Sequence, residues 1–391
     1  MGALILPGRQ GLAKLVSVLG SGEGETRLVG GAVRDTLAGE EVKDIDLATR
    51  LAPQDVVLRL EKAGIKAVPT GIAHGTVTAV LSSGPVEVTT LRRDVSTDGR
   101  RATIAYTDDW REDAARRDFT INALYADPET GEIFDYFGGV DDLAAGIVRF
   151  IGEPFQRIAE DHLRILRFFR FHARFGKGSP DAASLAACAA RANDLMALSR
   201  ERIADELIKL LTLPEPVETV RLMLTHRIFA PVLPEIVSAA GLAALIAIED
   251  AADPVRRVSS LLPADPDKTG AVAKRLKLSK LATKRLVLAA AREAADAINP
   301  RALAYRIGLE GARDRLMLGG HAAALATLDG WTIPIFPLTG GAIVARGIKA
   351  GPDVARLLQA AEAQWLAEGF PDAARAEAIA DDMVREAASM T

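Results

Sequence analysis

Short alternating runs of apolar and polar residues fill the chain up to about Ile151. Glycine or proline separates most of these runs, which is typical of strands in a half-buried sheet. The stretch 55–65 instead spaces its apolar residues for one face of a helix. We therefore predict a mixed α/β or α+β domain with a small sheet. The expected strands are Thr26–Gly31, Asp44–Thr49, Gly75–Leu81, Val86–Leu91 and Gly131–Phe137.

From Glu153 onward the pattern becomes helical. The stretch Glu153–Gly176 has apolar residues at helical spacing, and Ser199–Leu211 reads as an amphipathic helix with Ser199 as its N-cap. Proline clusters at 213–218, 231–235 and 263–267 interrupt an otherwise helical remainder. The pattern predicts a sheet-containing head followed by a longer all-α part.

Composition narrows the class of protein. The chain has 391 residues, of which 49% are hydrophobic and 26% charged, so it has the composition of a globular protein and not of a disordered tail. Its one cysteine, Cys188, excludes an intrachain disulfide and a zinc site built from several cysteines. A single cysteine also fits a reducing compartment, and we expect a cytoplasmic protein.

Charge and hydropathy exclude two further classes. The longest apolar stretch, 237–248, is too short to span a bilayer, and the first residues lack the pattern of a secretory signal. We therefore expect no membrane partner. The formal net charge is -4, so binding to a nucleic acid must depend on local basic patches.

The sharpest chemical pattern lies in the stretch 28–49, LVGGAVRDTLAGEEVKDIDLAT. A strand runs into Gly30-Gly31 and a short helix, and a second strand is expected to carry Asp44 and Asp46. Residues i and i+2 of a strand share a face, and two neighbouring carboxylates repel unless a cation lies between them. Oxygen ligands suit Mg²⁺, and a glycine turn at a helix N-terminus suits a triphosphate. Arg34 adds a possible charge-assisted contact.

These motifs resemble a known family. GGAVRD followed by DID is similar to the head signature of the polymerase-β-type nucleotidyltransferases. RRDFTINALY (Arg116–Tyr125) and EDHLRILRFFRF (Glu160–Phe171) resemble class II CCA-adding tRNA nucleotidyltransferases and their bacterial poly(A) polymerase relatives. The resemblance runs from about Arg27 to Leu211, with a weaker echo at Pro337–Leu358. It implies an α+β head, residues 1–151, a helical neck, 152–213, and an elongated helical body and tail, 214–391, that binds tRNA.

The resemblance also implies roles for individual residues. Asp44 and Asp46 would hold catalytic Mg²⁺, which would activate the primer 3′-hydroxyl and neutralise charge on the phosphates. Family members commonly have a third carboxylate on a neighbouring strand; Glu87 stands at such a place, and an outward strand residue is an equal reading. The expected nucleotide contacts come from Gly31, Arg34 and Arg117, and Asp118 is expected near the ribose.

The stretch EDHLR indicates how a protein chooses bases. Asp161 and Arg164 are three residues apart on an expected helix and would share a face. An Asp carboxylate only accepts hydrogen bonds and an Arg guanidinium only donates them. Cytosine and adenine both present an amino donor beside a ring-nitrogen acceptor, whereas uracil and guanine present the reverse. The pair is therefore expected to select CTP and ATP, as the family's proposed mechanism has it, and by resemblance Arg167 and Arg170 support nucleotide contacts.

Several activities remain open within the resemblance. The segment Thr70–Val80 lacks the Gly-Arg-Arg-Phe of bacterial poly(A) polymerases, and Leu91–Trp110 supplies a loop, with Asp98–Arg101 in it, that enzymes adding only CC tend to lack. We therefore expect template-independent addition of CCA to tRNA from CTP and ATP. An enzyme that adds only A, a bacterial poly(A) polymerase and a non-catalytic RNA-binding protein that retains the head are the alternatives.

One basic stretch fits the expected RNA partner. Ala271–Leu286 carries six Lys or Arg residues in a helical pattern, and Arg200 and Arg202 add more. Such a patch binds backbone phosphates, and a solvated helix face is an equal reading. Few aromatic residues lie near it, which favours recognition of duplex RNA. Histidines show no metal-ligand spacing, so a phosphohydrolase is not expected; the oligomeric state, monomer or dimer, is left open.

Overall fold

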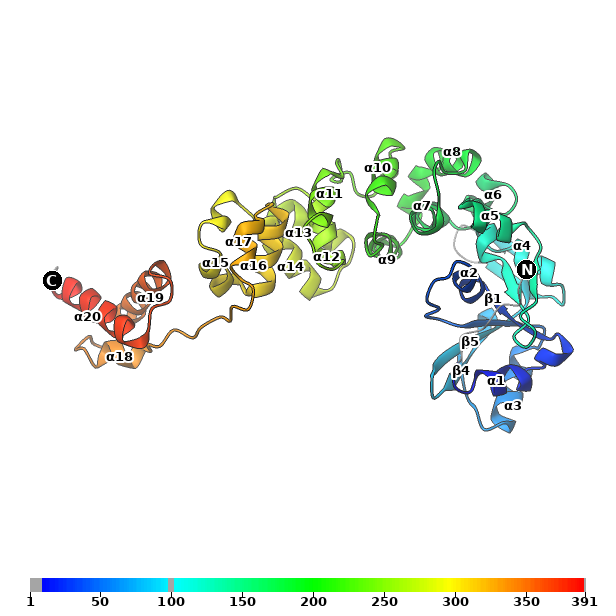
Figure 1. Ribbon diagram of the computed structural model, residues 1–391, viewed down its shortest axis with the longest axis horizontal. Coiled ribbons are helices and arrows are strands. Elements are labelled where there is room, and N and C mark those ends of the chain that lie inside the picture. Colours follow the sequence, from blue (N-terminus) through cyan, green and yellow to red (C-terminus); the bar gives the residue numbers. More distant parts are fainter. Residues whose placement is uncertain (1–8, 98–101, 390–391) are drawn as a thin grey trace. The chain divides into compact units, whose positions relative to one another are not determined.

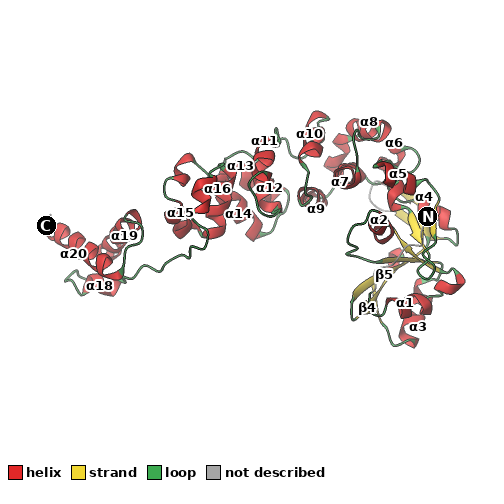
Figure 2. Ribbon diagram, in the orientation of Figure 1, coloured by secondary structure: helices red, strands yellow, loops and turns green. Residues whose placement is uncertain are grey.

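The computed structural model describes residues 9–97 and 102–389 and divides the chain into two compact units, Met1–Ile236 and Val237–Thr391. The loop element Asp98–Arg101 lies outside the described residues. Strands are confined to the first unit, and the second contains helices only in its described part (Figures 1 and 2). The α+β head followed by a helical part is thus confirmed, whereas the boundaries at 151 and 213 stay predictions.

The head is built on a mixed sheet. In the described residues it has seven strands in the order β3-β4-β5-β2-β1-β8-β9, and only β2 and β5 pair in parallel. Two further strands, β6 and β7, form a separate hairpin. The strands are β1 (Thr26–Val29), β2 (Asp46–Thr49), β3 (Lys66–Gly71), β4 (Thr76–Leu81), β5 (Gly84–Thr90), β6 (Arg92–Thr97), β7 (Ala102–Tyr106), β8 (Leu124–Ala126) and β9 (Ile133–Asp135).

Two apolar clusters fix the sheet between its neighbours. Leu28 and Leu47 belong to the cluster that includes residues of the first helices, whereas Val29 and Ala48 belong to a cluster with Trp110. Because successive strand residues point to opposite faces, β1 and β2 contribute to both clusters. The sheet is therefore covered on both faces near the strands that lead to the glycine turn.

The helices of the first unit surround the sheet and continue beyond it. Proline at the first helical position begins α3 and α6, where a missing N–H costs nothing. Ser199 stands at the N-cap position of α9, as predicted, but its side chain makes no capping bond. The helices are α1 (Leu12–Val18), α2 (Gly31–Leu37), α3 (Pro53–Lys62), α4 (Trp110–Ala115), α5 (Gly139–Ala145), α6 (Pro154–Glu160), α7 (Arg164–Phe175), α8 (Ala182–Ala190), α9 (Arg200–Leu211) and α10 (Val217–Thr225).

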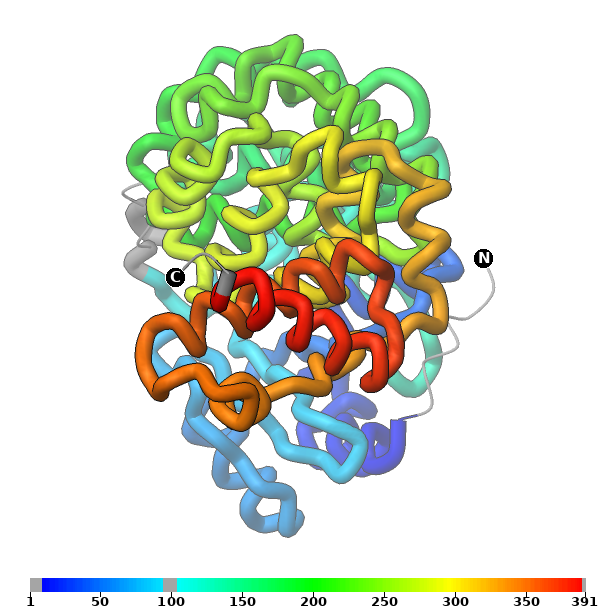
Figure 3. The backbone as a smooth tube through the Cα atoms, turned by 90° about the vertical axis from the view of Figure 1, so that its left-hand side faces the viewer, coloured from blue at the N-terminus to red at the C-terminus, as the bar shows by residue number. Residues whose placement is uncertain are grey.

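The second unit has its own apolar clusters. One joins Ala312, Leu316 and Leu328, and another gathers around Trp365, where α19 and α20 pack side by side (red in Figure 3). The helices are α11 (Ala240–Ile246), α12 (Pro254–Leu261), α13 (Pro266–Arg275), α14 (Lys280–Ala290), α15 (Pro300–Ile307), α16 (Leu309–Leu318), α17 (Ala322–Ala326), α18 (Gly340–Val344), α19 (Pro352–Ala367) and α20 (Ala373–Ser389). None of the helices in the described part of the chain is long and apolar enough to cross a membrane.

Candidate active site

One open cavity of about 350 Å³ gathers most of the predicted site residues. Its lining comes from the glycine turn and α2, the start of β2, the segment 116–122, Asp161 and α7, all within the first unit. Its polar lining contains both carboxylates and guanidinium groups, as a site for a charged nucleotide requires. The lining residues are Gly30, Gly31, Arg34, Asp46, Arg116, Arg117, Asp118, Asn122, Asp161, Arg164, Arg167 and Phe171.

The acidic residues lie at the start of β2. The strand begins at Asp46, so the prediction that Asp44 is also a strand residue is wrong. Asp44 is exposed in the loop before the strand, and the buried Ile45 between the two acids points toward the core. Asp44 is not among the lining residues of the cavity, but its charge still acts on Asp46. Ile45 thus points to the core between two acids that do not, as in a strand, although the hydrogen-bonded pairing of β2 begins only at Asp46.

Glu87 is the direct neighbour of Asp46. In the parallel pairing of β2 and β5 these two residues are register partners. Burial, and after it the charges of Glu87 and Asp44, raise the pKa of the Asp46 carboxyl to about 6 against the opposing effect of Arg117. With a pKa of about 6 this carboxyl is mostly ionised at pH 7, and the like charges beside it give this edge of the site a surplus of negative charge.

Oxygen ligands and surplus negative charge fit a hard divalent cation. Within residues 9–97 and 102–389 no three His, Cys, Asp or Glu side chains converge closely enough to enclose a metal. Mg²⁺ is usually held by one or two carboxylates together with waters and substrate phosphates, so a closed protein cage is not required. Asp46, with Asp44 and Glu87 near it, has the oxygen ligands that such an open site would require.

The glycine turn brings the backbone close to the cavity. Gly30 has φ 64° and ψ −118°, a conformation that side-chain-bearing residues avoid, and α2 begins at the next residue. A Cβ atom at Gly30 would lie 3.5 Å from the backbone oxygen of Asn122 and 3.6 Å from Nη1 of Arg117. These distances are ordinary van der Waals contacts, so the first glycine is needed for its backbone conformation and not for space.

Arg34 is buried beneath the glycine turn and is only 5% exposed. Its Nε donates to Asp35 at 2.8 Å, and its Nη1 donates to the side-chain oxygen of Asn122. The guanidinium also lies over the rings of Phe171 (5.0 Å) and Phe175 (4.5 Å) of α7. Burial lowers the pKa of Arg34, while Asp35 opposes that shift. A positive group is thus fixed at the place predicted for a triphosphate.

Arg117 is held by two partners behind the cavity. Its Nη2 donates to Asp113 at 3.0 Å and its Nε to the Tyr125 hydroxyl at 3.2 Å. The Tyr125 hydroxyl itself donates to Asp113 at 2.6 Å. Burial tends to lower the pKa of Arg117, but Tyr125 and Asp113 outweigh it and raise the pKa. Arg117 therefore keeps its charge and a single orientation toward the cavity.

Asp118 links the head to α7. Arg167 donates to one of its oxygens at 2.7 Å, and the other accepts from the Asn122 side chain and from the Phe119 backbone N–H, both at 2.9 Å. Although burial alone would raise it, Arg167 and Asn122 bring the pKa of Asp118 down to about 2. Asp118 is thus a fully engaged anion that positions Arg167, and its predicted contact with a ribose remains untested.

The predicted single helix Glu153–Gly176 is in fact two helices. α6 ends at Glu160, α7 begins at Arg164, and Asp161 between them has extended backbone angles. Oδ1 of Asp161 accepts from the backbone N–H of Leu163 at 3.1 Å, which replaces a helical bond with a local turn. The prediction that Asp161 and Arg164 share a helix face is therefore wrong, yet both line the cavity because the turn faces it.

Asp161 and Arg164 do not pair with each other. Arg202 of α9 donates to Oδ2 of Asp161 at 2.7 Å, across the fold. Arg164 donates to the backbone oxygens of Arg157 and Arg116, both at 3.0 Å, and to Glu160 at 2.7 Å. Each side chain is held by other residues, so the Asp161 carboxylate and the Arg164 guanidinium do not neutralise each other in the cavity.

Arg170 is the one predicted nucleotide contact on α7 that does not line the cavity. Its Nε donates to Glu206 of α9 at 2.6 Å, and its guanidinium lies 4.4 Å from the centre of the Phe171 ring. Glu206 is only 3% exposed and also faces Arg167 at 3.9 Å. In this structure Arg170 joins α7 to α9, and its role as a nucleotide contact stays a prediction.

Three residues that line the cavity are not among the predicted nucleotide or metal contacts: Arg116, Asn122 and Phe171. Asn122 lies inside the RRDFTINALY motif, and it binds both Arg34 and Asp118. A motif that names a stretch does not say which of its residues face inward, so Asn122 could be found only by asking which polar residue of the motif would be buried. Glu87 was left open because one strand gives no register against another.

Two family models match parts of the first unit. The family description "Poly A polymerase head domain" matches residues 26–149, and "Probable RNA and SrmB- binding site of polymerase A" matches residues 179–239. The head sheet and its acidic, glycine-bounded cavity thus define an enzyme of the nucleotidyltransferase class.

Similar proteins narrow that class. The human protein "CCA tRNA nucleotidyltransferase 1, mitochondrial" is 35% identical over 92% of this chain and 87% of its own length. The "CCA-adding enzyme" of Anoxybacillus flavithermus is 37% identical over 58% of this chain and 56% of its own length. The chain belongs to the CCA tRNA nucleotidyltransferase family.

Solved structures of low identity share the fold. The CCA-adding enzyme of Bacillus stearothermophilus in complex with CTP matches 98% of this chain and 100% of its own, with a TM-score of 0.70 at 23% identity. The Thermotoga maritima CCA-adding enzyme complexed with tRNA matches 96% of this chain and 95% of its own, with a TM-score of 0.72 at 19% identity. The head and the helical part therefore follow the CCA-adding enzyme fold.

Proposed function

We propose that this enzyme adds CCA to the 3′ end of tRNA from CTP and ATP, without a template and with release of pyrophosphate. One observation carries the proposal: a single cavity brings the carboxylate Asp46 together with the glycine turn and with Asp161 and Arg164. Those are the parts needed to hold a phosphate chain, a divalent cation and the edge of a base. The names and ligands of the related CCA-adding enzymes support it.

Asp161 and Arg164 have the chemistry to read a base edge. The Asp161 carboxylate has used one bond on each oxygen, so further lone pairs remain to accept from an amino group. The Arg164 guanidinium has five N–H donors, and its described bonds leave some of them for a ring nitrogen. With uracil or guanine the carboxylate would face a carbonyl acceptor and the guanidinium would face an N–H donor, which costs about 1–3 kcal/mol for each unpaired group.

The other end of the cavity has the chemistry for the triphosphate. Arg34 and Arg117 are held in fixed orientations by buried partners, so they need little reordering when an anion binds. Asp44 and Asp46 would hold Mg²⁺, with Glu87 as a third carboxylate. That ion, when bound, would lower the pKa of the attacking 3′-hydroxyl and stabilise charge on the phosphates. Asp118 keeps Arg167 beside the same cavity.

One assay tests the proposal. The purified full chain is incubated with Mg²⁺ and tRNAs that end before, within or after CC, each with one labelled nucleoside triphosphate at a time. We expect C to be added to the shorter tRNAs, one A to be added after CC, and synthesis then to stop. Omission of Mg²⁺ in the presence of EDTA should abolish each step.

Other outcomes would identify the alternatives. Addition of A only to a preformed CC end would identify an A-adding enzyme, and a long A tail would identify a poly(A) polymerase. A protein that binds tRNA but extends no primer would be a non-catalytic RNA-binding protein. We propose a cytoplasmic location, and microscopy of the tagged chain tests it, since the human and mouse relatives carry "mitochondrial" in their names.

A further inference from the structure

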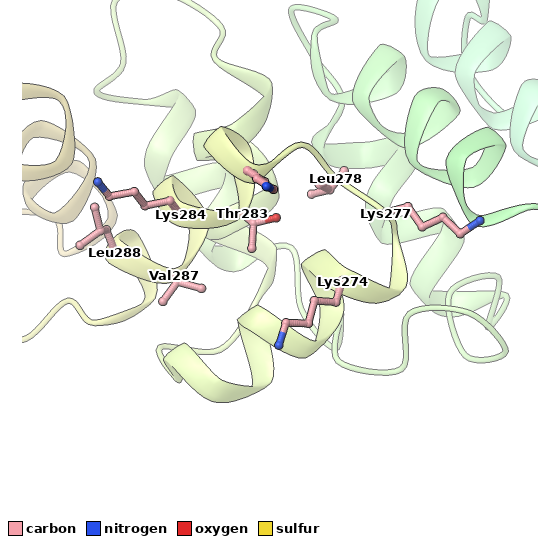
Figure 4. Close-up of a pocket in the computed structure, with 8 residues that line it drawn as sticks. Lys274, Lys277, Leu278, Thr283, Lys284, Val287 and Leu288 are labelled. Atoms are coloured by element: carbon pink, nitrogen blue, oxygen red, sulfur yellow. The ribbon is translucent and has the colours of Figure 1, made fainter.

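Positively charged side chains line two cavities of this protein in different ways. The cavity of about 580 Å³ in the second unit is lined by exposed lysines of α13, α14 and the turn between them (Figure 4): Lys274, Lys277, Lys280 and Lys284. Around the active-site cavity the arginines are instead held by buried polar partners. Two of them, Arg34 and Arg167, are joined by a chain of hydrogen bonds that runs through Asn122.

The chain of hydrogen bonds runs along the wall of the active-site cavity from α2 to α7. Nη1 of Arg34 donates to the side-chain oxygen of Asn122, and Nδ2 of Asn122 donates to Oδ1 of Asp118 at 2.9 Å. Oδ2 of Asp118 accepts from Nε of Arg167 at 2.7 Å. Arg34 lies next to the glycine turn, and Arg167 belongs to the same helix as Arg164. The chain therefore connects the end of the cavity proposed for the triphosphate with the helix that carries a base-reading arginine.

Asn122 has the donor and the acceptor that the middle of this chain requires. An Arg guanidinium donates hydrogen bonds and cannot accept them, whereas an ionised carboxylate accepts and cannot donate. Burial raises the pKa of Asp118, but Arg167 and Asn122 outweigh it and bring that pKa to about 2, so the carboxylate is ionised at neutral pH. Asn122 must therefore present its oxygen to Arg34 and its NH₂ group to Asp118, which fixes the orientation of the amide.

The surroundings also fix Asn122 itself. The residue is only 7% exposed, so an amide without partners would be costly at this position. Its backbone N–H donates to the Phe119 oxygen at 2.9 Å, at the end of a short 3-10 helix, Thr120–Asn122. Two residues further along the chain, the Leu124 oxygen accepts from the Gly30 N–H at 2.9 Å. Asn122 is therefore attached to the glycine turn through the backbone and to Asp118 through its amide.

We propose that Asn122 is a positioning residue, which sets the distance between Arg34 and Arg167 so that one nucleoside triphosphate contacts both cations at once. The proposal rests on the proposed function, because it concerns nucleotide binding in the same cavity. Without Asn122, Arg34 would keep its bond to Asp35, but the two cations would no longer be held relative to each other. A ligand that spans the cavity would then lose more affinity than a ligand that fills only one end of it.

The test compares two ligands that are added without tRNA. CTP spans the cavity, whereas inorganic tripolyphosphate fills only its phosphate end. Asn122→Ala should lower the affinity for CTP roughly 10- to 50-fold and the affinity for tripolyphosphate by no more than about threefold. Isothermal titration calorimetry of the full chain with Mg²⁺ measures both affinities, and thermal melting followed by circular dichroism checks that each variant is folded. Asn193→Ala, at an exposed asparagine outside the cavity, is the matched control and should change neither affinity.

An exchange of two side chains provides a second test. Asn122→Asp alone places two carboxylates side by side, and their repulsion should weaken CTP binding at least as much as Asn122→Ala does. Adding Asp118→Asn restores an acceptor for Arg34 and a donor between the two residues, so it should recover about 5- to 10-fold of the lost affinity. The Phe119 N–H then loses its acceptor, so the recovery stays incomplete. Both substitutions keep the shape of the side chain, and this pair carries the test where Asn122→Ala does not fold.

Three outcomes would overturn the proposal. They are unchanged CTP affinity in Asn122→Ala, equal weakening of CTP and tripolyphosphate binding, and no recovery of CTP affinity in the exchanged variant. Each would show that Asn122 supports the fold without setting the distance between the cations. Nucleotide addition to tRNA is measured separately, so a wild-type chain that binds CTP but extends no tRNA would refute the proposed function and leave this result intact.

Discussion

Asp46 on β2 and Glu87 on β5 are register partners in the one parallel pairing of the described head sheet. The two carboxylates come from segments 41 positions apart, and the pairing places them side by side. The charge of Glu87 raises the pKa of Asp46, in addition to the effect of burial. The edge of the sheet therefore holds more negative charge than the Asp44-Asp46 pair alone provides.

Glu87 should be needed for catalysis. Glu87→Gln removes one negative charge with little change in shape, so the divalent cation should bind more weakly and kcat should fall by about 10²-fold or more. The measurement is single-turnover addition of C as a function of Mg²⁺ concentration. Glu61→Gln, on the exposed surface of α3, is the matched control. A change of less than about twofold in the Glu87 variant would show that Glu87 is only a surface residue of the strand.

Asp46 should trade stability for activity. Its pKa in the folded protein is raised to about 6, so folding becomes less favourable as pH rises from about 4 to 6, and the full cost persists above 6. Asp46→Asn avoids that charge. In EDTA at pH 7 it should raise the free energy of unfolding by about 1–2 kcal/mol while it abolishes nucleotide addition.

The pH dependence provides the control for this prediction. Near pH 4 the folded wild type already carries a proton on Asp46, so urea unfolding curves of wild type and variant should converge. Asp108→Asn, at an exposed aspartate outside the cavity, should leave the difference between pH 4 and pH 7 unchanged. An Asp46→Asn protein less stable than wild type at pH 7 would refute the electrostatic explanation.

Arg202 should influence which base is accepted. It donates to Asp161 from behind the cavity, so Arg202→Gln frees the carboxylate to rotate. The preference for CTP over UTP in kcat/KM should fall about 5- to 10-fold, and Asp161→Ala should relax selection against UTP and GTP further. A purely structural role would lower both rates equally. Lys209→Gln, on the same helix and paired with Asp205, should keep the wild-type ratio.

Gly30 should tolerate no side chain. Gly30→Ala places a side chain on a backbone with positive φ, which should cost about 1–3 kcal/mol of stability. It should also raise KM for CTP, because the turn borders the triphosphate end of the cavity. Gly24→Ala has a similar φ of 71° but open space around its Cβ, so it tests backbone strain alone and should leave KM unchanged.

Local motifs predicted the parts of the site but not their connections. Gly31, Arg34, Asp46, Arg117, Asp161, Arg164 and Arg167 all line the cavity, as expected of residues in ordered motifs. Arg170 has the same helical spacing as Arg167, yet Glu206 of α9 draws it away. The partner lies 36 positions further along the chain, and no periodicity within α7 indicates it. Long-range ion pairs of this kind decide which side chains face a ligand.

In the fold, too, features that depend on neighbouring residues were predicted better than the helix break at Asp161. Alternation and glycine turns located β1, β4 and β5 closely, because those patterns depend on neighbouring residues. The helix at Glu153–Gly176 was expected to be continuous, since apolar spacing does not record that Asp161 caps a turn with its own carboxylate. Hydrophobic periodicity indicates which face is buried, whereas a helix end depends on one polar side chain that competes for a backbone N–H.

Arg34 has a consequence for motion in the first unit. Its guanidinium lies against Phe171 and Phe175 of α7, while its backbone belongs to α2 directly after the glycine turn. A rotation of α7, which carries Arg164, would therefore move the side chain that we propose contacts the triphosphate. A different base in the cavity would then change the position of Arg34 through its contacts with Phe171 and Phe175.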